Sequence, residues 1–138
     1  MAPAIIVSRP AVTVQEPIRL LVVDDDVRVR RAIVQTLCRE RDLQLVGQAA
    51  DIANALAAAE RHRPRVALVD VLLPDARSGL SVIDALSRRH DCVVVAMSVA
   101  DGQREAALTR GAAAFVTKDG DIDAVLAAVR GAGSSGPA

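Results

Sequence analysis

Aromatic side chains are almost absent from this chain, because Phe115 is the single aromatic residue among 138. A surface without aromatic rings has no platform on which the bases of a single-stranded nucleic acid can stack. The 17 basic and 17 acidic residues cancel to a formal net charge of zero, so no overall basic surface attracts nucleic acid or an anionic membrane. We therefore expect this chain to bind neither nucleic acid nor a membrane directly.

Long hydrophobic runs and paired cysteines are also missing. No apolar run approaches the roughly 18 residues that indicate a membrane span. The N-terminal stretch MAPAIIVSRPAVTVQEP has no basic leader and is interrupted by prolines, so it is not predicted to be a signal peptide, and we expect a cytoplasmic protein. Cys38 and Cys92 lack the spacing of metal ligands, and we predict that both are small buried hydrophobes rather than a disulfide pair.

Aliphatic residues are abundant, and their spacing alternates between the periods of strands and helices. Hydrophobic residues make up 51% of the chain, which is enough for the core of one domain. Helical spacing and N-cap residues (Asp51, Asp101) predict helices alternating with apolar strands. The predicted strands are 18–23, 43–49, 66–70, 92–97 and 114–117, and the predicted helices are 27–40, 52–62, 79–90, 101–111 and 121–131. This alternation predicts an α/β fold, a doubly wound five-stranded parallel sheet.

The ends of the chain fall outside this alternation. We expect residues 1–17 to form a flexible N-terminal extension, residues 18–131 to form the domain, and residues 132–138 to form a flexible tail.

Polar residues stand where four of the predicted strands end. Asp24-Asp25-Asp26 follow the first strand, and Asp70 ends the third. Ser98 follows the fourth strand, and Thr117-Lys118 closes the fifth. Open parallel sheets place their functional sites beyond the carboxyl ends of the strands, so we expect these side chains to converge.

Several carboxylates packed together repel one another unless a cation lies between them. Oxygen ligands without histidine or cysteine favour Mg²⁺ over softer metals. A carboxylate beside a metal ion, a lysine and a hydroxyl is suited to accept a phosphoryl group, because the cations neutralise oxygens that gain charge during transfer. Asp70, with Lys118 and Ser98 beside it, is the predicted acceptor.

These residues resemble the receiver domains of response regulators in two-component signalling. The matching stretches are LLVVDDD (20–26), VALVDVLLPD (66–75), VVAMS (94–98) and GAAAFVTKD (111–119), within a resemblance that covers about residues 18–131. The resemblance implies a flavodoxin-like (βα)5 fold with strand order 2-1-3-4-5. The sequence around 111–131 is most similar to receivers that carry LuxR-type output domains.

The resemblance also implies the metal ligands and the phosphoacceptor. Asp24 and Asp25 would bind Mg²⁺, together with Asp70 and the backbone carbonyl of Leu72. Asp70 would receive the phosphoryl group from a histidine kinase or a phosphotransfer protein. Asp26 would be a neighbour of this site and not a direct ligand.

The switch residues follow from the same resemblance. Lys118 would stabilise the phosphoryl group, Ser98 would move toward it, and Phe115 would follow into the vacated space. The surface of the helix 101–111, the strand 114–117 and the helix 121–131 would then change. That surface would contact a partner protein or a missing output domain, or form a homodimer. Such a protein is not an enzyme with an independent substrate.

Three features depart from the family pattern. The loop from Pro74 to Gly79 is one residue longer than usual, and Ser78 replaces an acid there. Val99 follows Ser98 where a smaller residue is common, which narrows access to the phosphoryl group. Neither Leu72 nor Ala100 carries a polar group to orient an attacking water, so we expect slow dephosphorylation.

Two alternatives stay open at this point. The altered loop and Val99 are compatible with a binding-only receiver that is never phosphorylated. Asp24-Asp25-Asp26 also resembles the Asp-x-Asp pair of haloacid-dehalogenase-type phosphatases, although Arg28 stands where that family has threonine or valine. Dinucleotide binding is not expected, because no G-x-G-x-x-G follows the first strand.

Overall fold

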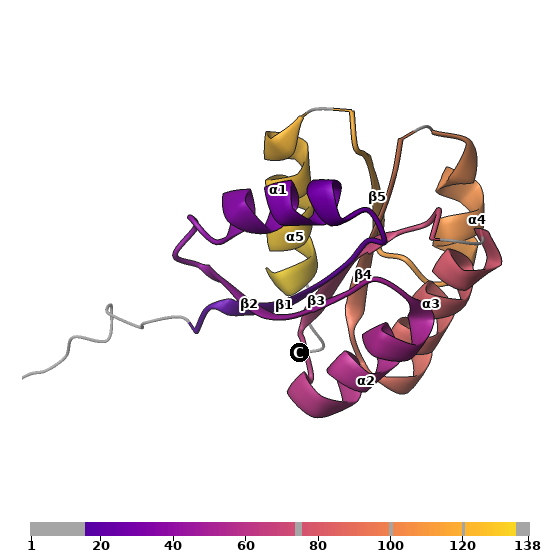
Figure 1. Cartoon of the computed structure of the whole chain (residues 1–138), viewed down its shortest axis with the longest axis horizontal. Coiled ribbons are helices and arrows are strands. Elements are labelled where there is room, and N and C mark those ends of the chain that lie inside the picture. Colours follow the sequence, from indigo (N-terminus) through magenta and orange to yellow (C-terminus); the bar gives the residue numbers. More distant parts are fainter. Residues whose placement is uncertain (1–15, 74–75, 100, 120, 135–138) are drawn as a thin grey trace, which may run out of the picture.

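A computed structural model of the chain describes residues 16–73, 76–99, 101–119 and 121–134, and for residues 76–78 it describes the backbone alone. The strands are β1 (Ile18–Val23), β2 (Leu43–Ala49), β3 (Val66–Asp70), β4 (Val93–Ser98) and β5 (Ala114–Thr117). The helices are α1 (Val27–Leu37), α2 (Ile52–His62), α3 (Ala76–Arg89), α4 (Arg104–Thr109) and α5 (Ile122–Ser134), and a 3₁₀ turn, η1 (Asp101–Gln103), precedes α4. Figure 1 follows the chain through these elements.

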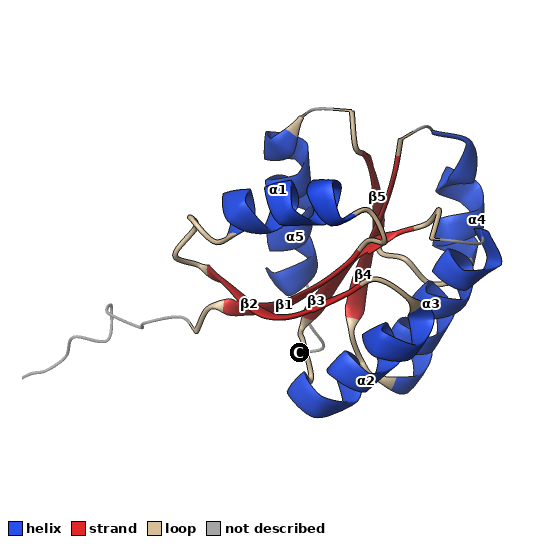
Figure 2. Cartoon of the chain, viewed as in Figure 1, coloured by secondary structure: helices blue, strands red, loops and turns tan. Residues whose placement is uncertain are grey.

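The five strands form one sheet in the order β2-β1-β3-β4-β5, and every neighbouring pair is parallel (Figure 2). The predicted doubly wound, flavodoxin-like (βα)5 fold is confirmed. Because β3 lies at the centre and is buried along its whole length, its last residue, Asp70, emerges in the middle of the carboxyl edge of the sheet.

Successive residues of each strand supply the cores on opposite faces of the sheet. In β1, Leu20 and Val22 pack on the face that α1 and α5 cover, together with Val125 and Val129 of α5. Leu21 and Val23 pack on the face that α2, α3 and α4 cover. Figure 1 shows α1 and α5 on one side of the sheet and α2 and α3 on the other. Burial on both faces explains why the central strand β3 is a continuous apolar run up to Asp70.

Aspartates fix the starts of three helices. Asp26 precedes α1, and its Oδ1 accepts hydrogen bonds from the backbone N–H groups of Arg28 and Val29. Asp51 accepts from Asn54 N at 2.9 Å, as its predicted role as the N-cap of α2 requires. Asp121 accepts from the N–H groups of the second and third residues of α5. The turns at the carboxyl edge, from β1 into α1 and from β5 into α5, are therefore held by local hydrogen bonds.

The predicted boundaries are wrong in several places. The first helix ends at Leu37 and not at residue 40, because the chain turns there to bring Leu43 into β2. Strand β4 runs one residue later than predicted and includes Ser98. The fourth helix begins at Arg104, and Asp101 lies in the preceding 3₁₀ turn instead of capping it. The last helix continues to Ser134, three residues past the predicted end at 131.

The two cysteines differ. Cys92 is buried as predicted, whereas Cys38 is exposed, so the prediction for Cys38 is wrong. Cys38 follows the last buried residue of α1 and caps that helix at the surface. Both thiols are free. Across the described ranges, no helix is long and apolar enough to cross a membrane.

Candidate functional site at the carboxyl edge

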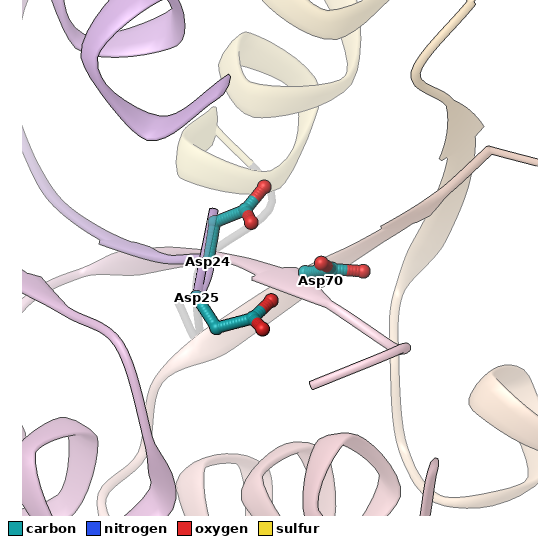
Figure 3. Close-up of side chains that lie close together, drawn as sticks. All are labelled: Asp24, Asp25 and Asp70. Atoms are coloured by element: carbon teal, nitrogen blue, oxygen red, sulfur yellow. The ribbon is translucent and has the colours of Figure 1, made fainter. Parts of the chain in front are cut away.

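Three carboxylates meet at the carboxyl edge of the sheet. Asp24 and Asp25 follow β1, and Asp70 ends the neighbouring strand β3. One oxygen from each of the three lies within 4.8 Å of the others. Figure 3 shows the side chains of Asp25 and Asp70 turned toward the same space, with Asp24 beside them. Asp24 and Asp70 are buried and Asp25 is exposed, so the cluster opens to solvent on the Asp25 side.

Lys118 places its ammonium group between the two buried acids. Its Nζ lies 2.8 Å from Asp24 Oδ2 and donates a hydrogen bond of 2.9 Å to Asp70 Oδ2. The lysine side chain is only 12% exposed. Its backbone N–H donates to Ser98 O at 2.7 Å, which anchors the end of β5 beside β4. A single cation therefore serves two buried carboxylates, and a third lies next to them.

The carboxyl of Asp24 has conflicting surroundings. Its Oδ1 accepts a hydrogen bond from Asp26 N at 2.9 Å, whereas Oδ2 lies close to Lys118 Nζ without an aligned hydrogen bond from the described residues. Burial raises the pKa of Asp24, and neither the Lys118 contact nor the Asp26 N–H offsets that burial fully. Burial by itself lowers the pKa of Lys118, but the adjacent carboxylates of Asp24 and Asp70 outweigh burial and raise that pKa. The ionised cluster is therefore short of positive charge.

The hydroxyl of Ser98 is buried at the end of β4. Within the described part of the chain, Ser98 Oγ has no hydrogen-bond partner. An unpaired buried hydroxyl costs about 1–3 kcal/mol, so a position that keeps one is a candidate for a ligand contact. Ser98 is one residue further along β4 than Met97, which pairs with Asp70 in the sheet, so the hydroxyl belongs to the same edge as the acceptor.

Leu72 follows β3 and Phe115 lies in β5, and both have predicted roles at this site. The N–H of Leu72 donates to Asp70 Oδ1 at 2.9 Å, which fixes the orientation of the carboxylate, while the Leu72 side chain is exposed. The use of its carbonyl as a metal ligand stays a prediction. Phe115 is buried in β5, opposite Ala96 of β4. Gly79 packs α3 against the backbone after Asp70, because a Cβ on Gly79 would lie 1.9 Å from Val71 O.

Two arginines take part in contacts that the sequence did not predict. Arg30 Nη1 donates to Asp24 O, and Arg30 Nε donates to Gln48 Oε1 at 3.2 Å. Its position four residues after Asp26, on the first turns of α1, is the only signal in the sequence that it could reach back to this turn. The guanidinium of Arg104 lies over the ring of Phe115, 4.9 Å from its centroid. No periodicity marks that contact, because it joins a short helix to a strand.

The described residues fit a hard divalent cation. The donor set consists of carboxylate oxygens, with no histidine or cysteine among the residues that meet at this edge. Among the described residues, buried Asp24 Oδ2 has the Lys118 ion pair but no aligned hydrogen bond and buried Ser98 Oγ has no hydrogen-bond partner, as expected where a ligand completes the site. The number of carboxylates exceeds the number of cations. A Mg²⁺ ion would correct that imbalance with the ligand type it prefers.

Some predicted features lie outside the described residues or are engaged elsewhere. Pro74, the side chain of Ser78, and Ala100 are not described, so the altered loop stays a prediction. Val99, the residue after Ser98, is exposed, and its effect on access to the phosphoryl group stays a prediction. The Oδ1 atom of Asp26, the second acid of the Asp-x-Asp pair in the phosphatase alternative, is engaged as the cap of α1.

Comparisons with known proteins agree on one family. The family model described as the response regulator receiver domain matches residues 20–130. The DNA-binding transcriptional activator DevR/DosR of Mycobacterium tuberculosis is 36% identical over 104 residues, which are 74% of this chain and 48% of that protein. The response regulator GacA of Pseudomonas protegens is 38% identical over 116 residues, 82% of this chain and 54% of that protein. This chain thus spans about half the length of these curated relatives.

Solved structures give the same result. The signal receiver domain of NarL from Mycobacterium tuberculosis superposes with a TM-score of 0.74 at 33% identity, covering 85% of this chain and 99% of that one. The response regulator domain of Thermotoga maritima CheB superposes with a TM-score of 0.79 at 25% identity, covering 88% of this chain and 100% of that one.

Proposed function

This chain belongs to the response regulator receiver family, and we propose that it is a phosphorylation-dependent switch whose phosphoacceptor is Asp70. A histidine kinase or a phosphotransfer protein would donate the phosphoryl group. The observation that carries the proposal is the convergence at one edge of three carboxylates, one lysine and one hydroxyl without a partner in the described chain. The chain is then a phosphoacceptor and has no independent substrate to turn over.

Asp70 is the carboxylate held for attack. Leu72 N–H fixes one of its oxygens and Lys118 Nζ contacts the other, so the group is oriented at the centre of the edge. During transfer the bond between phosphorus and the donor's nitrogen breaks, and a bond between phosphorus and a carboxylate oxygen of Asp70 forms. Lys118 stays beside the acceptor and neutralises charge on the transferred oxygens.

Asp24, Asp25 and Asp70 would hold Mg²⁺, with the carbonyl of Leu72 as a further proposed ligand. When bound, Mg²⁺ supplies positive charge that stabilises the phosphoryl oxygens. The positions of Asp24 and Asp25 are set by their turn, where Asp26 N–H donates to Asp24 Oδ1 and Arg30 Nη1 donates to Asp24 O.

Ser98 would link phosphorylation of Asp70 to a conformational change at the protein surface. Its unpaired hydroxyl would donate to a phosphoryl oxygen, and Phe115, on the same face of the sheet, would adjust to the displacement. The surface formed by α4, β5 and α5 would change its population of conformations. That surface is where a partner, an output domain or a second copy of the chain would dock.

The output itself is also a proposal. DevR/DosR is a DNA-binding transcriptional activator, and the matched region is 48% of its length. We propose that this receiver controls an output domain of that general kind, or a separate partner protein, inside the cytoplasm where histidine kinases present their phosphoryl groups.

Intact mass spectrometry after incubation with acetyl phosphate and Mg²⁺ tests the proposal. We expect one phosphoryl adduct on the wild type. The adduct should be absent from Asp70→Asn and after chelation of Mg²⁺, and it should persist in Asp91→Asn, a matched change at the opposite edge. A folded wild type that acquires no adduct would overturn the proposal and favour the binding-only alternative, with Val99 and the 74–79 loop as the features to change next.

A further inference from the structure

The single aromatic ring of the protein is covered by a cation. Phe115 belongs to β5, an edge strand that pairs only with β4, and yet it is just 6% exposed. Ala107 of α4 and Ala112 contribute to the same apolar cluster, but both side chains are small. The guanidinium of Arg104 lies 4.9 Å from the ring centroid, which is within the range of a cation–π contact.

Arg104 is itself held by an acid. Its Nε donates to Asp101 Oδ1 at 3.2 Å, from the first residue of α4 to the first residue of η1. The two side chains are 49% and 69% exposed, and an ion pair at such exposure contributes little stability by itself. The ion pair instead restricts the orientation of the Arg104 guanidinium, because a guanidinium bound to Asp101 has fewer conformations in which it lies away from the Phe115 ring.

The start of α4 lacks a side-chain cap in the described chain. The residue before the helix, Gln103, makes no side-chain capping hydrogen bond. The helix has six residues, too few to be stable without tertiary contacts. The contacts of Arg104 therefore add to the attachment that the buried Ala107 gives this segment.

This segment is also the direct continuation of the proposed switch strand. Ser98 ends β4, and η1 begins at Asp101, three residues later. Phe115 pairs with Ala96, and because side chains alternate along a strand, Phe115, Ala96 and Ser98 lie on the same face of the sheet. A displacement of Ser98 therefore acts on both partners of the ring: the strand beneath it and the turn that holds Arg104.

We propose that Arg104 is a positioning residue of the switch: with Asp101 it forms a clasp that holds the Phe115 ring in its buried position and sets how readily the α4–β5 surface changes. The coupling to Ser98 rests on the proposed function, whereas the clasp itself exists without phosphorylation. A cation–π contact at an exposed site corresponds to roughly a two- to fivefold change in the ratio of buried to exposed ring. Loss of Arg104 should shift the population by that factor.

The lone aromatic makes the clasp directly observable. Uniform incorporation of 4-fluorophenylalanine labels Phe115 alone, so the whole protein gives one fluorine site for ¹⁹F NMR. Without any phosphoryl donor, the change in its chemical shift between H₂O and D₂O reports solvent contact of the ring. We expect a small isotope shift in the wild type, a larger one in Arg104→Ala, and an intermediate one in Arg104→Lys, which keeps a cation.

Arg110→Ala is the matched control, because Arg110 is the C-cap of the same helix, its replacement removes the same charge, and among the described residues the cation over the ring is that of Arg104. It should retain the wild-type isotope shift, and thermal unfolding should show that every variant is folded. If Arg104→Ala does not fold, Asp101→Asn tests the same clasp by releasing the guanidinium. An isotope shift unchanged in Arg104→Ala, or equally enlarged in Arg110→Ala, would overturn the proposal.

Repeating the measurement with acetyl phosphate and Mg²⁺ separates the two proposals. Absence of a mass adduct overturns the phosphoacceptor and leaves the donor-free result on the clasp standing. A mass adduct without movement of the Phe115 resonance overturns the coupling to Ser98. A mass adduct with a larger response in Arg104→Ala than in Arg110→Ala supports it.

Discussion

Two charge clusters lie at opposite edges of the same sheet, and each shares one cation among several carboxylates. At the amino edge, Arg130 of α5 donates to both oxygens of Asp42 at 2.7 and 3.0 Å and to Glu40 at 2.6 Å. At the carboxyl edge, Lys118 contacts Asp24 and Asp70, with Asp25 next to them. The amino-edge cluster is half-exposed and has three hydrogen bonds from Arg130, whereas two of the three acids at the carboxyl edge are buried beside one lysine.

The pKa values of the acids in the two clusters are shifted in opposite directions. Hydrogen bonds from Arg130 lower the pKa of Asp42, and burial raises the pKa of Asp24. A planar guanidinium satisfies two carboxylates with several N–H groups, whereas one ammonium group cannot replace the water lost by two buried acids. The Arg130 contacts therefore tie α5 to the turn before β2, whereas at the carboxyl edge two buried carboxylates share one ammonium group.

The largest predicted effect is the difference in stability between replacing Lys118 and replacing Arg130, the cations of the two clusters. Lys118→Met leaves Asp24 and Asp70 buried without a counter-charge and should lower the free energy of unfolding by about 3 kcal/mol. Arg130→Met should have a small effect, because water screens the remaining acids. Urea denaturation at neutral pH measures both. Mg²⁺ should recover part of the loss in Lys118→Met and none in Arg130→Met, and equal losses without that recovery would remove the contrast.

The exposed apolar rim of the carboxyl edge should slow the loss of the phosphoryl group. Leu72 is exposed beside Asp70 and offers no polar group to an attacking water. Leu72→Asn should speed dephosphorylation about tenfold, a modest share of what a positioned polar group contributes. Leu72→Ala is the control for lost bulk and should change the rate less. Decay of the mass adduct after removal of the donor gives the rates, and an unchanged rate in Leu72→Asn would contradict the assignment.

The two aspartates should respond oppositely to pH. Because the pKa of Asp24 is raised, its ionised form costs stability at neutral pH, and that cost disappears as the pH falls through the raised pKa toward the ordinary value of 3.8. Because the pKa of Asp42 is lowered from 3.8, its contribution is present above that value and is lost as the pH falls through the lowered pKa. Without Mg²⁺, Asp24→Asn should therefore raise stability at pH 7 and Asp42→Asn should lower it.

Both differences from the wild type should vanish in strong acid. Urea denaturation of the wild type and the two variants across the acid range checks this. A stability that changes in the same direction for both variants at pH 7 would break the comparison.

The smallest effect concerns the thiol at the amino edge. Burial raises the pKa of Cys92 to about 12, and the side chain is shielded from solvent at the start of β4. Cys38 is exposed. A thiol reagent at mildly alkaline pH should therefore modify Cys38 rapidly and Cys92 only as the amino edge opens. Equal rates for the two thiols would show that this edge is not closed.

The order of the elements and the position of the acids could be predicted from the sequence. Four of the five strands have the predicted bounds, because each is a mainly apolar run bounded by turn or cap residues. Asp24, Asp70 and Lys118 could be placed together because the ends of parallel strands share an edge. The reach of Arg30 to Asp24 O and of Arg104 to Phe115 could not, since both depend on the angle of a helix against the sheet. The hydrogen bonds of Arg130 to Asp42 and Glu40 could not be predicted either, because these partners lie 88 and 90 residues away along the chain.

Thermal unfolding as a function of Mg²⁺ concentration tests the central claim most directly. If Asp24, Asp25 and Asp70 form a cation site, Mg²⁺ should stabilise the wild type progressively, by about 1.4 kcal/mol when its concentration is roughly ten times the dissociation constant. Asp25→Asn, a change at an exposed ligand, should weaken that dependence, and Asp123→Asn, a matched exposed acid on α5, should preserve it. A melting temperature independent of Mg²⁺, or equally dependent in both variants, would contradict the account.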